Sequence, residues 1–282
     1  MRIVARGTPL RYEEVGQGRP IILFTGWALD SRFMIRHYEP IFEQRSGWRR
    51  IYPDMPGMGM SPRADWIHSQ DDMLETAMGF LDAVAPGERP SLVGASWGAY
   101  IALGIAHERG PQLDGMMLVV PVIQPERALR DVPEHVVLRA DPQVVADLAA
   151  DEAQWAEIAV VQSRESLMSY RETIKPALAL ADLPFLDHVS ERYALSFTAD
   201  RLAEPFPAPV LLLAGRQDSA CGYRDAWPLL SQMPRATFAV LDRAGHDLAD
   251  VQPKLFRALT SEWLDRVEEY AASREAVAAG AR

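Results

Sequence analysis

The apolar positions of this chain form short continuous runs that alternate with longer stretches of helical period. Continuous runs are typical of strands buried on both faces of a sheet, and spacings of three and four are typical of amphipathic helices. The runs predict strands at residues 20–24, 48–53, 91–93, 116–121, 209–214 and 237–241, and alternation at 3–5 and 10–15 predicts a hairpin. Strands that alternate with helices predict an α/β fold, with a doubly wound, mostly parallel sheet of about eight strands.

Helical periodicity also predicts where the helices lie. We expect them at residues 70–85, 143–150, 153–170, 184–194, 225–232 and 253–270, and we expect the Ala-rich tail 271–282 to fray. Residues 124–205 contain no strand-like run and several prolines. We therefore expect residues 1–123 and 206–282 to form the core, and residues 124–205 to form a helical lid (cap) over the sheet edge where ligands bind in such folds.

A Gly-x-Ser-x-Gly pentapeptide at residues 94–98 lies between a predicted strand and a helix-compatible run. A sharp turn from strand to helix lifts the Ser96 hydroxyl off the sheet edge and points the helix N-terminus at any anion that forms there. Gly94 and Gly98 leave room for the neighbouring chain in such a turn. The stretch therefore predicts that Ser96 is a nucleophile.

A serine nucleophile needs a base that takes its proton and an acid that orients the base. His246 follows the last predicted strand and Asp218 follows the strand before it, so both fall at the sheet edge from which Ser96 emerges. The other histidines lie in early surface segments, at the far end of the helix after Ser96, or in the lid. The order Ser, Asp, His predicts that Ser96, Asp218 and His246 are the catalytic residues.

Backbone amides would bind the oxyanion that forms when Ser96 attacks a carbonyl. The amide of Trp97 opens the helix, and the amide of Trp27 lies in the loop after the first buried strand, so we expect these two donors to form the oxyanion hole. We also expect Met58 and Leu248 to line the substrate pocket. Such a lining favours an apolar acyl group or a small lactone over a sugar.

These motifs together resemble those of the α/β-hydrolase fold superfamily, in its lid-bearing serine hydrolase branch. Residues 94–98 resemble the nucleophile elbow, residues 54–61 resemble an Asp-x-Pro-Gly-x-Gly-x-Ser loop, and Gly245-His246 resembles the Gly-His of the last catalytic loop. The resemblance implies an esterase-like enzyme with a Ser-His-Asp triad.

The departures from the family pattern narrow the range of activities. Ser96 argues against relatives that open epoxides or remove halogens, because these are understood to use an aspartate nucleophile. Proline iminopeptidases resemble residues 96–98, but their His-Gly-Gly-Pro-Gly loop is absent. Thr25 stands where many relatives have a histidine, and Asp247 stands where carbon–carbon bond hydrolases often have a tryptophan.

Composition restricts the partners of this chain. A net charge of −10 over 282 residues disfavours nucleic acid and anionic membranes. No apolar run is long enough to span a membrane, and the N-terminus lacks the apolar core of a secretory signal, so we expect a cytoplasmic protein. Cys221 is the single cysteine and is interpreted as a packed thiol, and the histidine spacings suggest no metal site. We expect a small-molecule substrate, no metal and no cofactor; the oligomeric state stays open.

The predicted lid is acidic, with fifteen acidic and eight basic residues, and this charge disfavours a strongly anionic substrate. The sequence therefore predicts a serine hydrolase that cleaves a small, mainly apolar carboxylic ester or lactone through an acyl-enzyme. Two alternatives stay open. One is a carbon–carbon bond hydrolase or lyase that uses the same residues, and the other is a hydrolase-like ligand receptor with little turnover.

Overall fold

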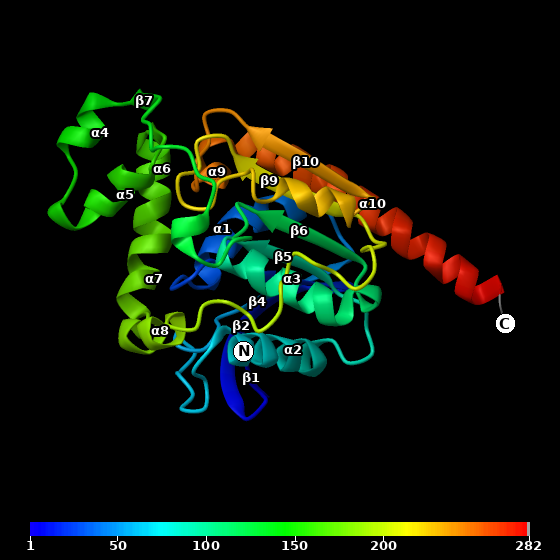
Figure 1. The fold of residues 1–282 in the computed structure, drawn as a ribbon. Helices are drawn as coiled ribbons and strands as arrows, with labels where there is room; N and C mark the ends of the chain where they lie inside the picture. Colours follow the sequence, from blue (N-terminus) through cyan, green and yellow to red (C-terminus); the bar gives the residue numbers. More distant parts are fainter. Residues whose placement is uncertain (281–282) are drawn as a thin grey trace.

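The computed structural model describes residues 1–280, which fold around the eight-stranded sheet seen in Figure 1. Its strands are β1 (Arg2–Ala5), β2 (Thr8–Gly16), β3 (Arg19–Phe24), β4 (Trp48–Pro53), β5 (Ser91–Ala95), β6 (Gly115–Val119), β9 (Val210–Gly215) and β10 (Ala236–Leu241), in the order β1-β2-β4-β3-β5-β6-β9-β10. The β1–β2 and β2–β4 pairs are antiparallel, and all other neighbours in this sheet are parallel. The predicted α/β class and mostly parallel sheet are confirmed.

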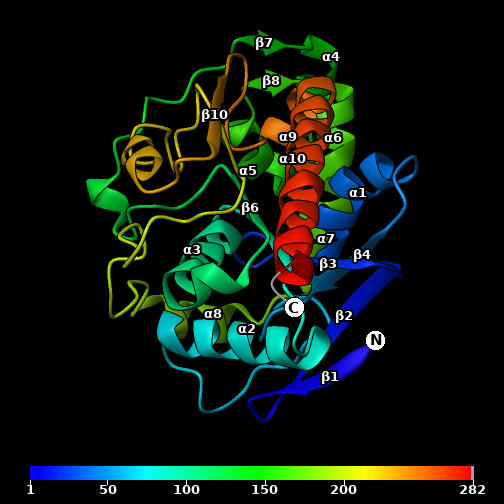
Figure 2. The same ribbon diagram turned by 90° about the vertical axis from the view of Figure 1, so that its right-hand side faces the viewer.

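Helices cover both faces of this sheet, as Figures 1 and 2 show. On one side, α2 (Gln70–Val84) and α3 (Trp97–Arg109) pack on a core that includes Ile22 and Phe24 of β3. On the other side, α1 (Ser31–Phe42) and α10 (Pro253–Gly280) pack on a core that includes Ile21 and Leu23. Successive residues of one strand thus enter opposite cores, which explains why the central strands appear as unbroken apolar runs. Among residues 1–280, none of the helices combines the length and hydropathy of a membrane-crossing segment.

The C-terminal helix is longer than the sequence pattern predicts. α10 runs from Pro253 to Gly280, so the expectation that the tail frays from residue 271 is wrong for the described residues. Ala271 is buried, and Arg274 forms an ion pair with Asp114 at the base of the sheet. Glu275 also pairs with Arg19. Since Ala, Glu and Arg are strong helix formers, local propensity and these tertiary contacts both extend the helix. Figure 1 shows its end projecting beyond the sheet.

Residues between β6 and β9 contribute the helices α4 (Pro142–Ala146), α5 (Ala153–Ile158), α6 (Arg164–Ser169), α7 (Lys175–Leu180) and α8 (Leu183–Ser190). The single helix predicted at 153–170 is wrong, because β8 (Val161–Gln162) interrupts it and pairs with β7 (Arg139–Ala140). The prediction that residues 124–205 contain no strands is also wrong, because β7 and β8 lie within this range. The helix predicted at 225–232 is a 3₁₀ turn over Trp227–Ser231.

The chain stays helical from α6 to α7 although it contains Pro176. Proline lacks an amide hydrogen, and its ring clashes with the carbonyl four residues earlier in a regular helix. A π-helical turn at Tyr170–Ile174 ends two residues before Pro176 and widens the helix in that turn. The proline therefore alters the helix without ending it.

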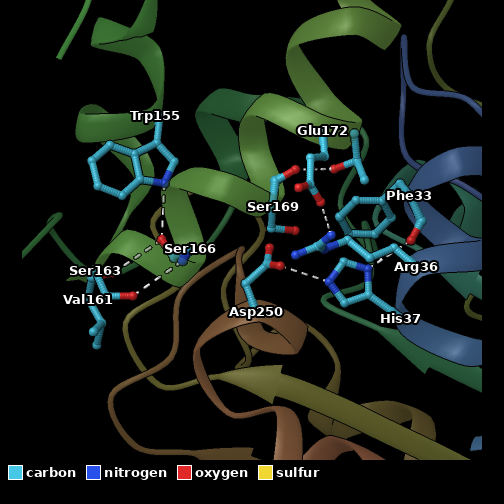
Figure 3. A network of polar contacts seen from close by, with 11 residues as sticks. Phe33, Arg36, His37, Trp155, Val161, Ser163, Ser166, Ser169, Glu172 and Asp250 are labelled. Carbon is cyan, nitrogen blue, oxygen red and sulfur yellow. Dashed lines mark hydrogen bonds and ion pairs between the residues drawn. The ribbon is translucent and has the colours of Figure 1, made fainter. Parts of the chain in front are cut away.

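The helical segment has a small core of its own and is fastened to the body of the molecule. Val144, Trp155, Leu167 and Tyr170 share a hydrophobic cluster. In the network of Figure 3, Arg36 of α1 pairs with Glu172 of the segment, close to the hydrogen bond of 2.8 Å between His37 and Asp250 within the body. The segment is thus held by ion pairs and packing together.

The return from α8 to β9 is made without a helix. Residues 191–209 form a coil, and several of its amides bond to side chains of other elements. Leu195 N donates to the Tyr100 hydroxyl at 2.8 Å, Ser196 N to the Asp71 carboxylate at 3.0 Å, and Leu202 N to the Gln232 amide oxygen at 2.7 Å. This coil borders a cavity of about 550 Å³ against α3.

Candidate active site

Ser96 occupies a strained turn between β5 and α3. Its φ of 55° and ψ of −114° lie in a region that non-glycine residues rarely adopt. A Cβ atom at Gly94 would lie 2.3 Å from the Gly98 carbonyl oxygen, and one at Gly98 would lie 2.3 Å from the Phe24 carbonyl oxygen. Both glycines are therefore required by the close approach of backbone, as the sequence pattern predicts.

The structure brings Ser96, His246 and Asp218 into one hydrogen-bonded chain. The Ser96 hydroxyl lies 2.9 Å from His246 Nε2, and His246 Nδ1 lies 3.0 Å from Asp218 Oδ2. With the proton on Nδ1, the imidazole donates to the carboxylate and accepts from the serine. This arrangement suits the transfer of the serine proton to histidine.

Backbone packing fixes the two loops that carry His246 and Asp218. Asp218 follows β9 and His246 follows β10, which are parallel neighbours in the sheet. A Cβ atom at Gly215 would lie 2.3 Å from the Gly245 carbonyl oxygen, so the loops meet main chain to main chain. The separation of His246 and Asp218 is therefore determined by backbone rather than by flexible side chains.

The charges of this pair stabilise each other. Asp218 is fully buried and accepts hydrogen bonds from the amides of Ala220, at 2.8 Å, and Cys221, at 3.0 Å. Burial raises the pKa of Asp218, but His246 and these amides lower it by more, so the carboxylate stays ionised. Burial lowers the pKa of His246, whereas Asp218 and Cys221 raise it, and the net pKa is well above 6.5.

The two loops expected to carry oxyanion donors lie beside Ser96. The Trp97 amide lies at the start of α3, where helix N–H groups have no intrahelical acceptor. A Cβ atom at Gly26 would lie 3.7 Å from Ser96 Cβ, which places the loop that carries the Trp27 amide against the serine. The Thr25 hydroxyl in the same loop is buried and has no hydrogen-bond partner among the described residues.

The loop at residues 54–61 holds the start of α1, which follows the Trp27 loop. The Asp54 carboxylate accepts from the Ser31 amide at 2.9 Å and from the Met60 amide at 3.0 Å. Gly59 has a φ of +54°, and a Cβ atom there would lie 2.5 Å from the same carboxylate. The Asp-x-Pro-Gly-x-Gly-x-Ser pattern therefore holds the start of α1 in place beside the loop that carries the Trp27 amide.

Comparison with known proteins agrees with this geometry. Residues 36–250 match the model of an α/β-hydrolase family described as serine aminopeptidase, S33. The chain belongs to this family.

Relatives of this α/β hydrolase are named for different substrates. It is 22% identical over 267 residues, 93% of this chain and 89% of the relative, to 2-hydroxy-6-oxo-6-(2'-aminophenyl)hexa-2,4-dienoic acid hydrolase of Metapseudomonas resinovorans. It is 24% identical over 257 residues, 84% of this chain and 88% of the relative, to pimeloyl-[acyl-carrier protein] methyl ester esterase of Shewanella oneidensis. An α/β superfamily hydrolase from Oenococcus oeni superposes with a TM-score of 0.86 at 25% identity, over 95% of this chain and 99% of that one.

Aromatic rings pack against Trp27 in the loop after β3 of the hydrolase. The rings of Trp27 and Trp97 meet edge to face at 5.1 Å, and Trp27 meets Tyr193 at 5.9 Å. Tyr193 comes from the coil after α8 and stacks on Tyr100. The sequence pattern did not single out Tyr193, because only the tertiary fold brings this residue back to the sheet edge.

Met58 and Leu248, the two residues expected in the pocket, are both fully buried. Met58 lies in the hydrophobic cluster on the α2 and α3 side, which also receives Trp27. Leu248 packs in the cluster on the α1 and α10 side. The structure therefore does not gather these two side chains into one cluster.

Two further polar side chains, those of Asp247 and Cys221, lie near His246. Asp247 Oδ2 is buried without a hydrogen-bond partner among the described residues, and burial together with Asp250 raises the pKa of Asp247 to about 7. Cys221 is buried, and its sulfur lies within 4.8 Å of ligand atoms of both Asp218 and His246. The sequence hinted at this contact only through the short spacing between Asp218 and Cys221.

Proposed function

We propose that this enzyme is a serine hydrolase that cleaves small, mainly apolar carboxylic esters or lactones. The observation that carries the proposal is the chain of hydrogen bonds from Ser96 to His246 to Asp218, at 2.9 Å and 3.0 Å, on a strained serine turn. Ser96 attacks the substrate carbonyl while His246 takes its proton. The amides of Trp27 and Trp97 bind the oxyanion, and His246 then protonates the leaving group. Water repeats the sequence on the acyl-enzyme.

In this proposal residues 124–205 form the lid that covers the sheet edge and selects the substrate. A Cβ atom at Gly245 would lie 2.7 Å from Val160 Cγ2, so the lid packs directly against the loop that carries His246. The aromatic wall of Trp27, Trp97 and Tyr193 supports an apolar acyl group, since burying such a group beside these rings is favourable. The acidic charge of the lid disfavours an anionic acyl group.

A matched pair of esters tests this substrate class. p-Nitrophenyl butyrate and p-nitrophenyl hemisuccinate have acyl groups of similar length, but the second carries a carboxylate. We expect kcat/KM to be at least about tenfold higher for the butyrate, because an unpaired buried carboxylate costs several kcal/mol. Equal rates, or a preference for the hemisuccinate, would contradict the apolar site. Lactones and thioesters of the same chain length then define the preferred bond.

A carbon–carbon bond hydrolase is the second candidate. The similarity over 93% of this chain to a hydrolase named for a dienoic acid substrate favours it. A vinylogous diketone assayed beside the ester pair discriminates the two candidates. A kcat/KM for the diketone more than about a hundredfold above that for the best ester would favour the second candidate, since that ratio corresponds to about 2.7 kcal/mol of transition-state binding.

The pH dependence of kcat/KM should follow the protonation of the His246 imidazole. The imidazole accepts the serine proton only when neutral, so activity falls as the pH falls through its pKa. Since that pKa is raised, the acidic limb should have its midpoint above pH 6.5. The same shift means that folding favours the protonated ring, a contribution to stability that is lost as the pH rises through the raised pKa.

A control variant tests whether the acidic limb of the pH profile belongs to His246. His135 lies exposed in the lid, and His135→Gln should leave the midpoint unchanged. Circular dichroism over the same pH range separates protonation of the base from unfolding. A midpoint below pH 6.5 in the wild-type enzyme would contradict the stabilising effect of Asp218 on the imidazolium.

A further inference from the structure

Three side chains that bind transition metals meet at the back of the candidate active site. A ring nitrogen of His246, a carboxylate oxygen of Asp218 and the sulfur of Cys221 all lie within 4.8 Å of one another. The sequence spacing alone did not suggest a metal site, because the ligands come from two loops. Asp218 and Cys221 belong to one turn, and His246 arrives from the loop after β10.

The local fold fixes this cluster. Asp218 Oδ1 accepts from the Cys221 amide at 3.0 Å, so the turn folds back and brings the thiol to the carboxylate side. Gly222 follows with a φ of +72°, and a Cβ atom there would lie 2.5 Å from the Asp131 carbonyl oxygen, so the turn has little freedom to open. The three ligands are therefore held together without a metal.

The geometry fits a tetrahedral ion of the size of Zn²⁺. With bonds of about 2.3 Å to sulfur and about 2.1 Å to nitrogen and oxygen, tetrahedral ligands lie about 3.4 to 3.6 Å apart. The three ligand atoms lie within 4.8 Å of one another, and side-chain movements of about 1 Å would bring them to the tetrahedral spacing. A mixed set of sulfur, nitrogen and oxygen donors suits Zn²⁺ better than Mg²⁺ or Ca²⁺, which prefer oxygen ligands alone.

We propose that Asp218, Cys221 and His246 form an inhibitory Zn²⁺ site within the catalytic centre. Binding releases the Cys221 thiol proton and, from the protonated form of His246, the imidazolium proton to water. The resulting thiolate, the Asp218 carboxylate and neutral His246 leave no net charge around a divalent ion. That neutrality lowers the cost of burying the metal. His246 is partly exposed, with 24% of its side chain accessible, and provides the route of entry.

The ion would inhibit through whichever nitrogen of His246 it binds. Coordination by Nε2 removes the lone pair that accepts the Ser96 proton. Coordination by Nδ1 moves the ring proton to Nε2, which then points an N–H at the serine and accepts nothing. In both cases Ser96 loses its base. The inhibition rests on the proposed function, whereas the metal site itself does not.

Inhibition of p-nitrophenyl butyrate hydrolysis by Zn²⁺ tests the effect, in a buffer that does not chelate metals. We expect half-inhibition at micromolar Zn²⁺, full recovery with EDTA, and no effect of Mg²⁺. In Cys221→Ser and Cys221→Ala the concentration for half-inhibition should rise at least about tenfold, since even ligand-supporting residues contribute that much to affinity. Inhibition that is equally strong in both variants would overturn the proposal.

A second histidine pair supplies the matched control. His68 and His188 lie exposed with ring nitrogens 3.3 Å apart, and they could bind Zn²⁺ at the surface. The variant His188→Ala should keep the full inhibition seen in the wild-type enzyme. Loss of inhibition in His188→Ala would assign the effect to the surface pair and refute the site at Cys221.

Cobalt binding gives a readout that does not need activity. Co²⁺ bound through a thiolate absorbs in the near ultraviolet, so titration should produce this band in the wild-type and His188→Ala proteins and not in Cys221→Ala. Absence of the band in folded wild-type protein overturns the metal site. A band without ester hydrolysis would instead retain the site and count against the proposed hydrolase function.

Discussion

The variant Ser96→Ala is expected to lower kcat for p-nitrophenyl butyrate by about 10⁴ to 10⁶-fold. Alanine removes the only atom that forms the acyl-enzyme in the proposed mechanism, while the amides of Trp27 and Trp97 still bind the carbonyl. Residual hydrolysis should therefore reflect attack by water within a preserved oxyanion site. Steady-state kinetics measure this loss, and a serine-directed phosphonate should label the wild-type protein and not the variant.

The control for this result is Ser190→Ala, at an exposed serine that bonds to the Asp187 carbonyl within the lid. It should keep full activity and full labelling at Ser96. Both variants should melt within a few degrees of the wild type, because neither substitution opens a cavity. Ser96→Ala protein that is folded and still hydrolyses the ester at more than a tenth of the wild-type rate would rule out Ser96 as the nucleophile.

The variant Asp218→Asn should lower kcat by about 10⁴-fold. The amide has the same shape as the carboxylate, but it cannot stabilise an imidazolium by charge. Its NH₂ group must also face either His246 Nδ1 or the amides of Ala220 and Cys221, all of which are donors in the wild-type arrangement. Facing the ring, it favours the tautomer with the proton on Nε2, which cannot accept from Ser96.

The same substitution in the neighbouring loop provides the comparison. Asp242 is exposed just after β10, and Asp242→Asn should leave kcat within about twofold, because its side chain lies on the surface. Loss of the Asp218 charge should also shift the acidic limb of the pH profile to lower pH. Activity of Asp218→Asn close to that of Asp242→Asn would exclude Asp218 as the orienting acid.

The sequence predicts the sheet well because its signals are local. Each central strand enters two cores and so appears as an apolar run, and the residues after β5, β9 and β10 meet at one edge because parallel strands share a direction. The positions of Ser96, Asp218 and His246 after these strands therefore predict that the three side chains lie close together. The structure then brings the three side chains together at hydrogen-bonding distance.

The sequence predicts the helical segment less well because its elements depend on contacts between distant residues. β8 interrupts a helical pattern because Val161 and Gln162 pair with β7, some twenty residues earlier. A helix passes through Pro176 because a π turn precedes it. Cys221 approaches His246 only through the meeting of two loops. None of these outcomes has a periodic signal in the sequence.

The coil at residues 191–209 has a consequence for motion. Side chains of α2 and α3 and the Gln232 side chain accept the amide hydrogens of Leu195, Ser196 and Leu202, so within the described residues no main-chain ladder joins this stretch to its neighbours. The amides of Leu195 and Ser196 should then exchange with solvent before those of the sheet strands. Tyr193 belongs to this coil and contacts Trp27. Movement of Tyr193 away from Trp27 would therefore open a route for substrate while Ser96, His246 and Asp218 keep their positions.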